Sequence, residues 1–137
     1  MITFEEFLQK YGTNTTTNFQ LIKWAKELNI KPFYYCMRDE ISSLKNKTKF
    51  YAITNIHTSD QKGVHHSALF KGDSMYFFDS YGLDPTKEII DLNYGPIKCS
   101  TFQIQKPGDK FCGQLSLWVL YQLSLGKPFE QIVLNLV

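Results

Sequence analysis

Five side chains in this sequence are of the types that support nucleophilic catalysis by a cysteine. They are the adjacent histidines His65 and His66, Asp79, Gln105 and Cys112. Such catalysis needs a base that generates the thiolate, a carboxylate or amide that orients the base, and donors that stabilise the anion on the attacked carbonyl. Cys112 is therefore a candidate nucleophile, one of the histidines a candidate base, Asp79 a candidate orienting group, and Gln105 a candidate donor.

Cys112 stands where a loop is expected to become a helix. The residues that follow it are apolar on every side of a helical wheel, which is typical of a buried helix, and Gly126-Lys127-Pro128 is a stop signal. A helix N-terminus carries partial positive charge and free N–H groups, which favour a thiolate and can hold an oxyanion. The alternative is a buried cysteine that only packs.

Two expected strands, 64–71 and 74–79, carry the histidines and Asp79. A Gly72-Asp73 step between them is a hairpin signal, and an acid at the end of one strand can meet a histidine on its partner. Adjacent histidines point to opposite faces of a strand and cannot easily share a metal ion. No Cys or acidic residue lies near them at the usual zinc spacing, so we expect no metal. Taken singly, the histidines could be a surface pair, Asp79 a strand-end cap, and Gln105 an ordinary loop residue.

The elements that must position these residues follow from capping signals and periodicity. Thr3–Glu6 and Thr17–Gln20 each form a capping box, which predicts the start of a helix. We expect helices near residues 3–10, 18–28, 86–92, 112–125 and 129–136, and strands near 32–37, 50–56, 64–71, 74–79 and 97–104. This order predicts a single α+β domain over residues 1–137, with a mostly antiparallel central sheet and a buried central helix carrying Cys112 at its N-terminus.

Composition limits the class of protein. The 137 residues, 43% hydrophobic and 20% charged, are typical of one globular domain, and a net charge of +2 gives no argument for nucleic-acid binding. The chain shows no signal peptide and no apolar run of membrane-spanning length. Three cysteines, an odd number, favour free thiols in a reducing compartment over a disulfide framework.

Taken in order, these residues resemble the His–Asp–Gln–Cys pattern of adenain-like cysteine proteases, relatives of the SUMO- and NEDD8-deconjugating proteases. The likeness is closest to the proteases of Polinton/Maverick transposons, adintoviruses and virophages. Three segments carry it: FFDSYGLDP, CGQLSLWVLYQLSLGKPFEQIV and TNFQLIKWAKELNIKPFYYCMRDEI. Together with the Gln105-to-Cys112 spacing, the resemblance covers residues 17–137.

The resemblance implies that Cys112 is the nucleophile, His66 the general base, Asp79 the group that orients His66, and Gln105 an oxyanion donor together with the N–H of Cys112. The choice of His66 over His65 depends on the alignment, which overlays His66–Leu69 on the family's His-Trp run. In that alignment the family's Trp is replaced by Ser67.

The resemblance also implies a polypeptide substrate cut at Gly-containing sites, in capsid or core precursors of a virus or virus-like element. We expect a monomer without a cofactor and without membrane attachment, in the cytoplasm or nucleus of a host cell or packaged in a virion, with a peptide or DNA activator as an open question. One alternative is removal of ubiquitin or a ubiquitin-like protein. Others are an acetyltransferase with the same Cys–His–acid layout and an inactive interaction module.

Overall fold

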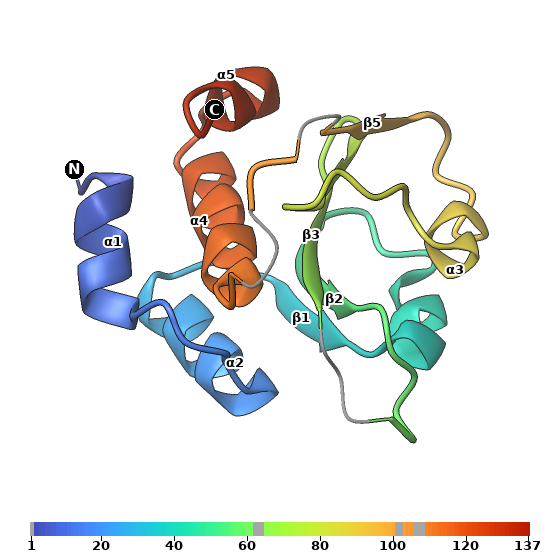
Figure 1. The fold of residues 1–137 in the computed structure, drawn as a ribbon. Helices are drawn as coiled ribbons and strands as arrows, with labels where there is room; N and C mark the ends of the chain where they lie inside the picture. Colours follow the sequence, from blue (N-terminus) through green and yellow to red (C-terminus); the bar gives the residue numbers. More distant parts are fainter. Residues whose placement is uncertain (1, 62–64, 101–102, 106–108) are drawn as a thin grey trace.

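A five-stranded sheet lies between two groups of helices in the computed structural model, which describes residues 2–61, 65–100, 103–105 and 109–137 (Figure 1). The strands are β1 (Phe33–Cys36), β2 (Phe50–Asn55), β3 (His66–Lys71), β4 (Met75–Phe78) and β5 (Ile97–Cys99). The helices are α1 (Phe4–Tyr11), α2 (Asn18–Glu27), the 3-10 helix η1 (Arg38–Leu44), α3 (Lys87–Ile90), α4 (Cys112–Ser124) and α5 (Phe129–Leu134). The expected α+β class is confirmed.

The sheet is mixed, which corrects the expectation that it is mostly antiparallel. Its order is β1-β2-β3-β4-β5, with antiparallel pairs β2/β3 and β3/β4 and parallel pairs β1/β2 and β4/β5. Both parallel pairs are joined by a connection that contains a helix, η1 in one case and α3 in the other. A connection of this kind returns the chain to the starting edge of the sheet, so that the next strand runs in the same direction.

Each face of the sheet buries a hydrophobic core. The helices α1, α2, α4 and α5 cover one face, and η1 and α3 cover the other (Figure 1). On the first face α4 packs against β2 and β3, and its residues from Cys112 to Leu120 are all buried. The expectation of a buried central helix is therefore confirmed.

Both predicted capping boxes are present. Thr3 and Glu6 bind each other's backbone N–H groups at the start of α1, and Thr17 and Gln20 do the same at the start of α2. These reciprocal bonds satisfy donors that a helix start would otherwise leave unpaired. They fix where α1 and α2 begin, and with them the loop that approaches α4.

Other elements differ from expectation in extent. The charged segment 38–40, expected as a turn, opens η1, while α3 and β5 are shorter than predicted. Val64, at the start of one expected strand, and residues 101–102, within another, lie outside the described residues. Among the described residues, no helix has both the length and the apolar character needed to cross a membrane.

Candidate active site

Cys112 is the first residue of α4 and is 8% exposed. The residue before it, Phe111, has no side-chain oxygen, and no side-chain hydrogen bond caps this helix. The contrast with the capped helices α1 and α2 matters, because the first N–H groups of a helix have no acceptor within the helix. At α4 no side chain occupies these donors beside the thiol.

Gly113 lets the α1–α2 loop approach the thiol closely. A Cβ at this position would lie 2.2 Å from Thr16 Oγ1 and 3.4 Å from His66 Nδ1. Thr16 is buried, and its hydroxyl has no hydrogen-bond partner among the described residues. The loop therefore packs over the start of α4 at a distance that only glycine allows.

His65, not His66, contacts Asp79. His65 Nε2 lies 2.8 Å from Asp79 Oδ2, and both side chains are buried. The same carboxylate oxygen accepts a hydrogen bond from Ser67 Oγ at 2.6 Å, and the other accepts one from the Tyr81 N–H at 2.8 Å. Asp79 is thus held on both oxygens, and the expectation that it orients His66 is wrong for this structure.

The hairpin register explains the correction. The expected two-residue Gly72-Asp73 loop would pair Lys71 with Ser74 and so place His66 opposite Asp79. The structure instead pairs Lys71 with Met75, which leaves a three-residue loop. Continued along the strands, this register places Ser67 opposite Asp79. A shift of one residue moves every side chain to the other face of the sheet, so that His65 shares a face with Asp79 and His66 does not.

His66 nevertheless contacts the thiol from its own side. Its Nδ1 lies 3.9 Å from Cys112 Sγ, and its backbone N–H donates to the same sulfur at 3.4 Å. Its Nε2 lies 2.8 Å from the hydroxyl of Tyr35 on β1. With His65 as the partner of Asp79, His66 occupies the position after it, where the family resemblance places an aromatic residue.

The environment favours an ion pair between Cys112 and His65. Burial by itself raises the pKa of the Cys112 thiol, but hydrogen bonds with His65 and His66 outweigh it and lower the pKa from 9.0 to about 6. Burial likewise lowers the pKa of His65, but hydrogen bonds with Asp79 and Cys112 raise it from 6.5 to about 9. Near neutral pH the pair is therefore a thiolate and an imidazolium.

The carboxyl group of Asp79 stays ionised under the same conditions. Burial raises its pKa, but hydrogen bonds from His65 and Ser67 and the backbone N–H of Tyr81 bring the net shift below the ordinary value. The ring of Tyr81 lies against His65, with centroids 4.8 Å apart. Neither Ser67 nor Tyr81 was predicted as part of the site, although the alternation of His65 and Ser67 along one face is visible in the sequence.

Gln105 is buried next to the segment that leads to Cys112. Its Nε2 donates to the Asp109 carbonyl at 2.6 Å, and its Oε1 accepts from Ser80 Oγ at 2.5 Å. No hydrogen bond between Gln105 and Cys112 occurs among the described residues, and Gln105 does not line the cavity beside the thiol. The structure thus brings Cys112, His65, His66 and Asp79 together, whereas Gln105 contacts Ser80 and Asp109 and does not reach the cavity.

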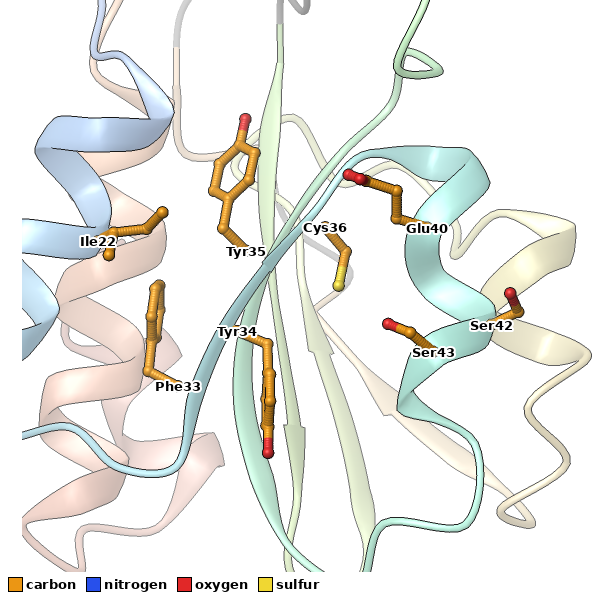
Figure 2. A pocket seen from close by; sticks show the side chains of 8 residues that line it. All are labelled: Ile22, Phe33, Tyr34, Tyr35, Cys36, Glu40, Ser42 and Ser43. Carbon is orange, nitrogen blue, oxygen red and sulfur yellow. The ribbon is translucent and has the colours of Figure 1, made fainter.

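A cavity of about 300 Å³ opens beside the thiol. It is lined by Thr15, Thr16, His65, His66, Tyr81, Asp109, Lys110 and Cys112. A larger hollow of about 590 Å³ lies along β1 and η1, where Tyr34, Tyr35 and Cys36 line it with residues of α2 and η1 (Figure 2). We assign the smaller cavity to the site because it alone of these two contains the thiol.

Within the described part of the chain, no group of three or more His, Cys, Asp or Glu side chains is placed to hold a metal ion. The three cysteines are free thiols. The two others differ from Cys112 in their environment: burial raises the pKa of Cys36 to about 11 and also raises that of Cys99. Only at Cys112 do histidines reverse this effect.

No protein-family model and no curated protein matches the sequence. Solved structures do share the fold. The ASFV pS273R protease superposes with a TM-score of 0.63 at 16% identity, covering 90% of this chain and 62% of that one. A second structure of the same protease gives a TM-score of 0.61 at 18% identity, covering 90% and 63%.

AvrA, in a structure described as a variant with IP6 and CoA, superposes with a TM-score of 0.50 at 16% identity and covers 96% of this chain and 55% of its own. The present chain thus spans less than two thirds of the length of these neighbours. At such identities the likeness concerns the fold, which this chain shares with a viral protease and with AvrA.

Proposed function

We propose that this chain is a cysteine protease with Cys112 as nucleophile, His65 as general acid and base, and Asp79 as the residue that orients His65. The observation that supports it best is the 2.8 Å contact of buried His65 with Asp79, on the cavity that also contains the Cys112 thiol at the uncapped N-terminus of α4. The hydrogen bond of His65 with the thiol also lowers the pKa of Cys112. The fold shared with the ASFV pS273R protease agrees with this assignment. It replaces His66 by His65 in the role of base.

In the proposed reaction the Cys112 thiolate attacks the carbonyl carbon of the scissile peptide bond. The imidazolium of His65 gives its proton to the leaving amine as the C–N bond breaks, which leaves a thioester on Cys112 and neutral His65. A water molecule then attacks the carbonyl carbon of the thioester through its oxygen, and His65 takes a proton from this water. The Cys112 thiolate departs, so that the thiolate–imidazolium pair is restored and the acid product is released.

The oxyanion formed in each attack needs donors beside the thiol. The N–H of Cys112 is proposed for this role because α4 has no side-chain cap. Gln105 is proposed as the second donor: one amide hydrogen binds the Asp109 carbonyl, and the other has no acceptor among the described residues. In this role the Gln105 amide would have to reach the cavity, which it does not line in this structure.

The proposed substrate is a polypeptide with small residues at the cleavage site, Gly in particular. The cavity of about 300 Å³ is at the small end of the range for ligand sites, and Thr16 and Tyr81 are among the residues that line it. Following the resemblance of the sequence to adenain-like proteases, we propose maturation of capsid or core precursors in a host cell or virion. Ubiquitin-like proteins, whose tails end in Gly-Gly, are the alternative substrate.

Acyl transfer is a second candidate function, favoured by the likeness to AvrA over 96% of this chain. It would share the first half of the mechanism, because a thioester on Cys112 can pass its acyl group to an amine or hydroxyl instead of water. The two functions differ in their donor, a peptide in one case and an acyl-CoA in the other. Release of free CoA upon incubation with acetyl-CoA would favour transfer.

The test is intact-mass labelling with a peptide electrophile that ends in Gly-Gly, applied to the wild type and to Cys112→Ala, His65→Ala and His66→Ala. We expect one adduct in the wild type, none in Cys112→Ala, and labelling slowed by about 10²–10⁴ in His65→Ala. His66→Ala should retain most of the rate. Labelling that survives in His65→Ala and vanishes in folded His66→Ala would overturn the assignment of the base.

A further inference from the structure

A chain of hydrogen bonds reaches Cys112 from the side opposite Asp79. It runs from Asn55 on β2 to Tyr35 on β1 and then to His66 on β3. Asn55 Nδ2 lies 3.3 Å from Tyr35 Oη, which lies 2.8 Å from His66 Nε2. The other nitrogen of His66 lies 3.9 Å from Cys112 Sγ. Asn55 and His66 are buried, and neither Asn55 nor Tyr35 was predicted to take part in the site.

The direction of every bond in this chain is fixed by its first member. The backbone N–H of His57 donates to Asn55 Oδ1 at 2.8 Å, which turns the Nδ2 donor of Asn55 toward Tyr35. The Tyr35 hydroxyl therefore accepts from Asn55, and its single hydrogen has one acceptor among its described partners, His66 Nε2. Nε2 is then unprotonated, and the ring proton of His66 lies on Nδ1, facing the sulfur.

We infer that His66 is a second, neutral donor to the Cys112 thiolate, and that Tyr35 and Asn55 are positioning residues that hold it in the Nδ1–H tautomer. The inference rests on the proposed function for the role of the thiolate. In this proposal the two histidines have different roles. His65 exchanges its proton during the reaction, whereas His66 keeps its proton because its other nitrogen is committed to Tyr35.

The strand register explains why these three side chains meet. Tyr35 is paired with Ile53 on β2, and Asn55, two residues further, is paired with His66 on β3. Because side chains alternate between faces, Tyr35, Asn55 and His66 all face the layer that contains α4. Tyr34 points the other way, and Figure 2 shows the hydroxyls of Tyr34 and Tyr35 directed to opposite sides.

Several titratable groups surround the thiol. The titratable groups that face Cys112 are His65, His66, Tyr35 and Tyr81, with Asp109 and Lys110 at the cavity wall. Burial raises the pKa of Tyr35, and the negative charge of Cys112 raises it further, against a hydrogen bond from Asn55 that lowers it. Tyr35 therefore keeps the proton that it donates to His66.

The experiment compares Tyr35→Phe with Tyr34→Phe, the same change on the neighbouring residue of β1. The pH dependence of Cys112 alkylation by iodoacetamide gives the midpoint of thiol ionisation without any substrate. We expect Tyr35→Phe to raise this midpoint by about 0.5–1 pH unit, a roughly 3- to 10-fold loss of thiolate at acidic pH, the size expected for one hydrogen bond of ordinary strength. Tyr34→Phe should leave it unchanged. Circular dichroism confirms that each variant is folded.

Two further measurements show whether Tyr35 acts through His66. In a His66→Ala background, Tyr35→Phe should no longer move the midpoint. The ¹⁵N chemical shifts of the His66 ring should show a protonated Nδ1 and an unprotonated Nε2 in the wild type. A protonated Nε2, or an equal effect of Tyr35→Phe with and without His66, would overturn the inference. Because no substrate is used, these outcomes are independent of whether the protein cleaves peptides.

Discussion

Replacing His65 with alanine is the perturbation that tests the site most directly. A pKa of about 6 leaves roughly 90% of Cys112 ionised at pH 7, whereas the ordinary value of 9.0 would leave about 1%. The loss of His65 removes its hydrogen bond to the thiolate, while burial continues to oppose ionisation. We therefore expect the midpoint of ionisation to move up by roughly one to three pH units.

The assay is the rate of iodoacetamide alkylation, measured by intact mass from pH 4 to pH 10 and assigned by peptide mapping. The midpoint is a better readout than one rate at pH 7, because a thiolate of higher pKa is intrinsically more nucleophilic and partly offsets the smaller ionised fraction. Cys36 and Cys99 serve as internal references, since burial raises the pKa of both. His66→Ala is the matched variant and should move the midpoint by less.

A midpoint of His65→Ala that stays within about half a pH unit of the wild type would refute the assignment. The same holds if His66→Ala gives the larger change while both variants remain folded. In either case the thiolate would owe its stability to His66 and the helix terminus, and the contact between His65 and Asp79 would be structural.

Three further outcomes follow from the same geometry. The wild-type kcat/KM for a Gly-Gly peptide should form a plateau between pH values near 6 and 9, because activity needs the thiolate, lost below the first, and the imidazolium, lost above the second. In Asp79→Asn the alkaline limb of that profile should move to lower pH, because the carboxylate that raises the pKa of His65 is gone; an unmoved limb would contradict this role. Gly113→Ala should destabilise the fold by about 1–3 kcal/mol in urea unfolding, because its Cβ would lie 2.2 Å from Thr16 Oγ1. Thr16→Ala, which removes an unpartnered hydroxyl, should restore part of that stability in the double variant, and no restoration would place the clash elsewhere.

The sequence by itself determined the local features of this protein. The capping boxes at Thr3 and Thr17 predicted where α1 and α2 begin, and both are present. The apolar run after Cys112 predicted a buried helix, because no face of it was polar enough for solvent, and α4 is buried continuously from Cys112 to Leu120. These signals depend only on residues that are near one another in the sequence, so the folded chain shows them as predicted.

The tertiary structure alone decided which histidine meets Asp79. The sequence placed both histidines and Asp79 on one hairpin, but which histidine contacts Asp79 depends on whether the loop after Lys71 has two residues or three. The one-residue difference moves every side chain of a strand to the other face relative to its partner strand. Strand direction was also decided at this level, since the helical connections through η1 and α3 make two of the four strand pairs parallel. The chain of contacts from Asn55 to Cys112 joins residues of three strands and a helix, and long-range register brings them together.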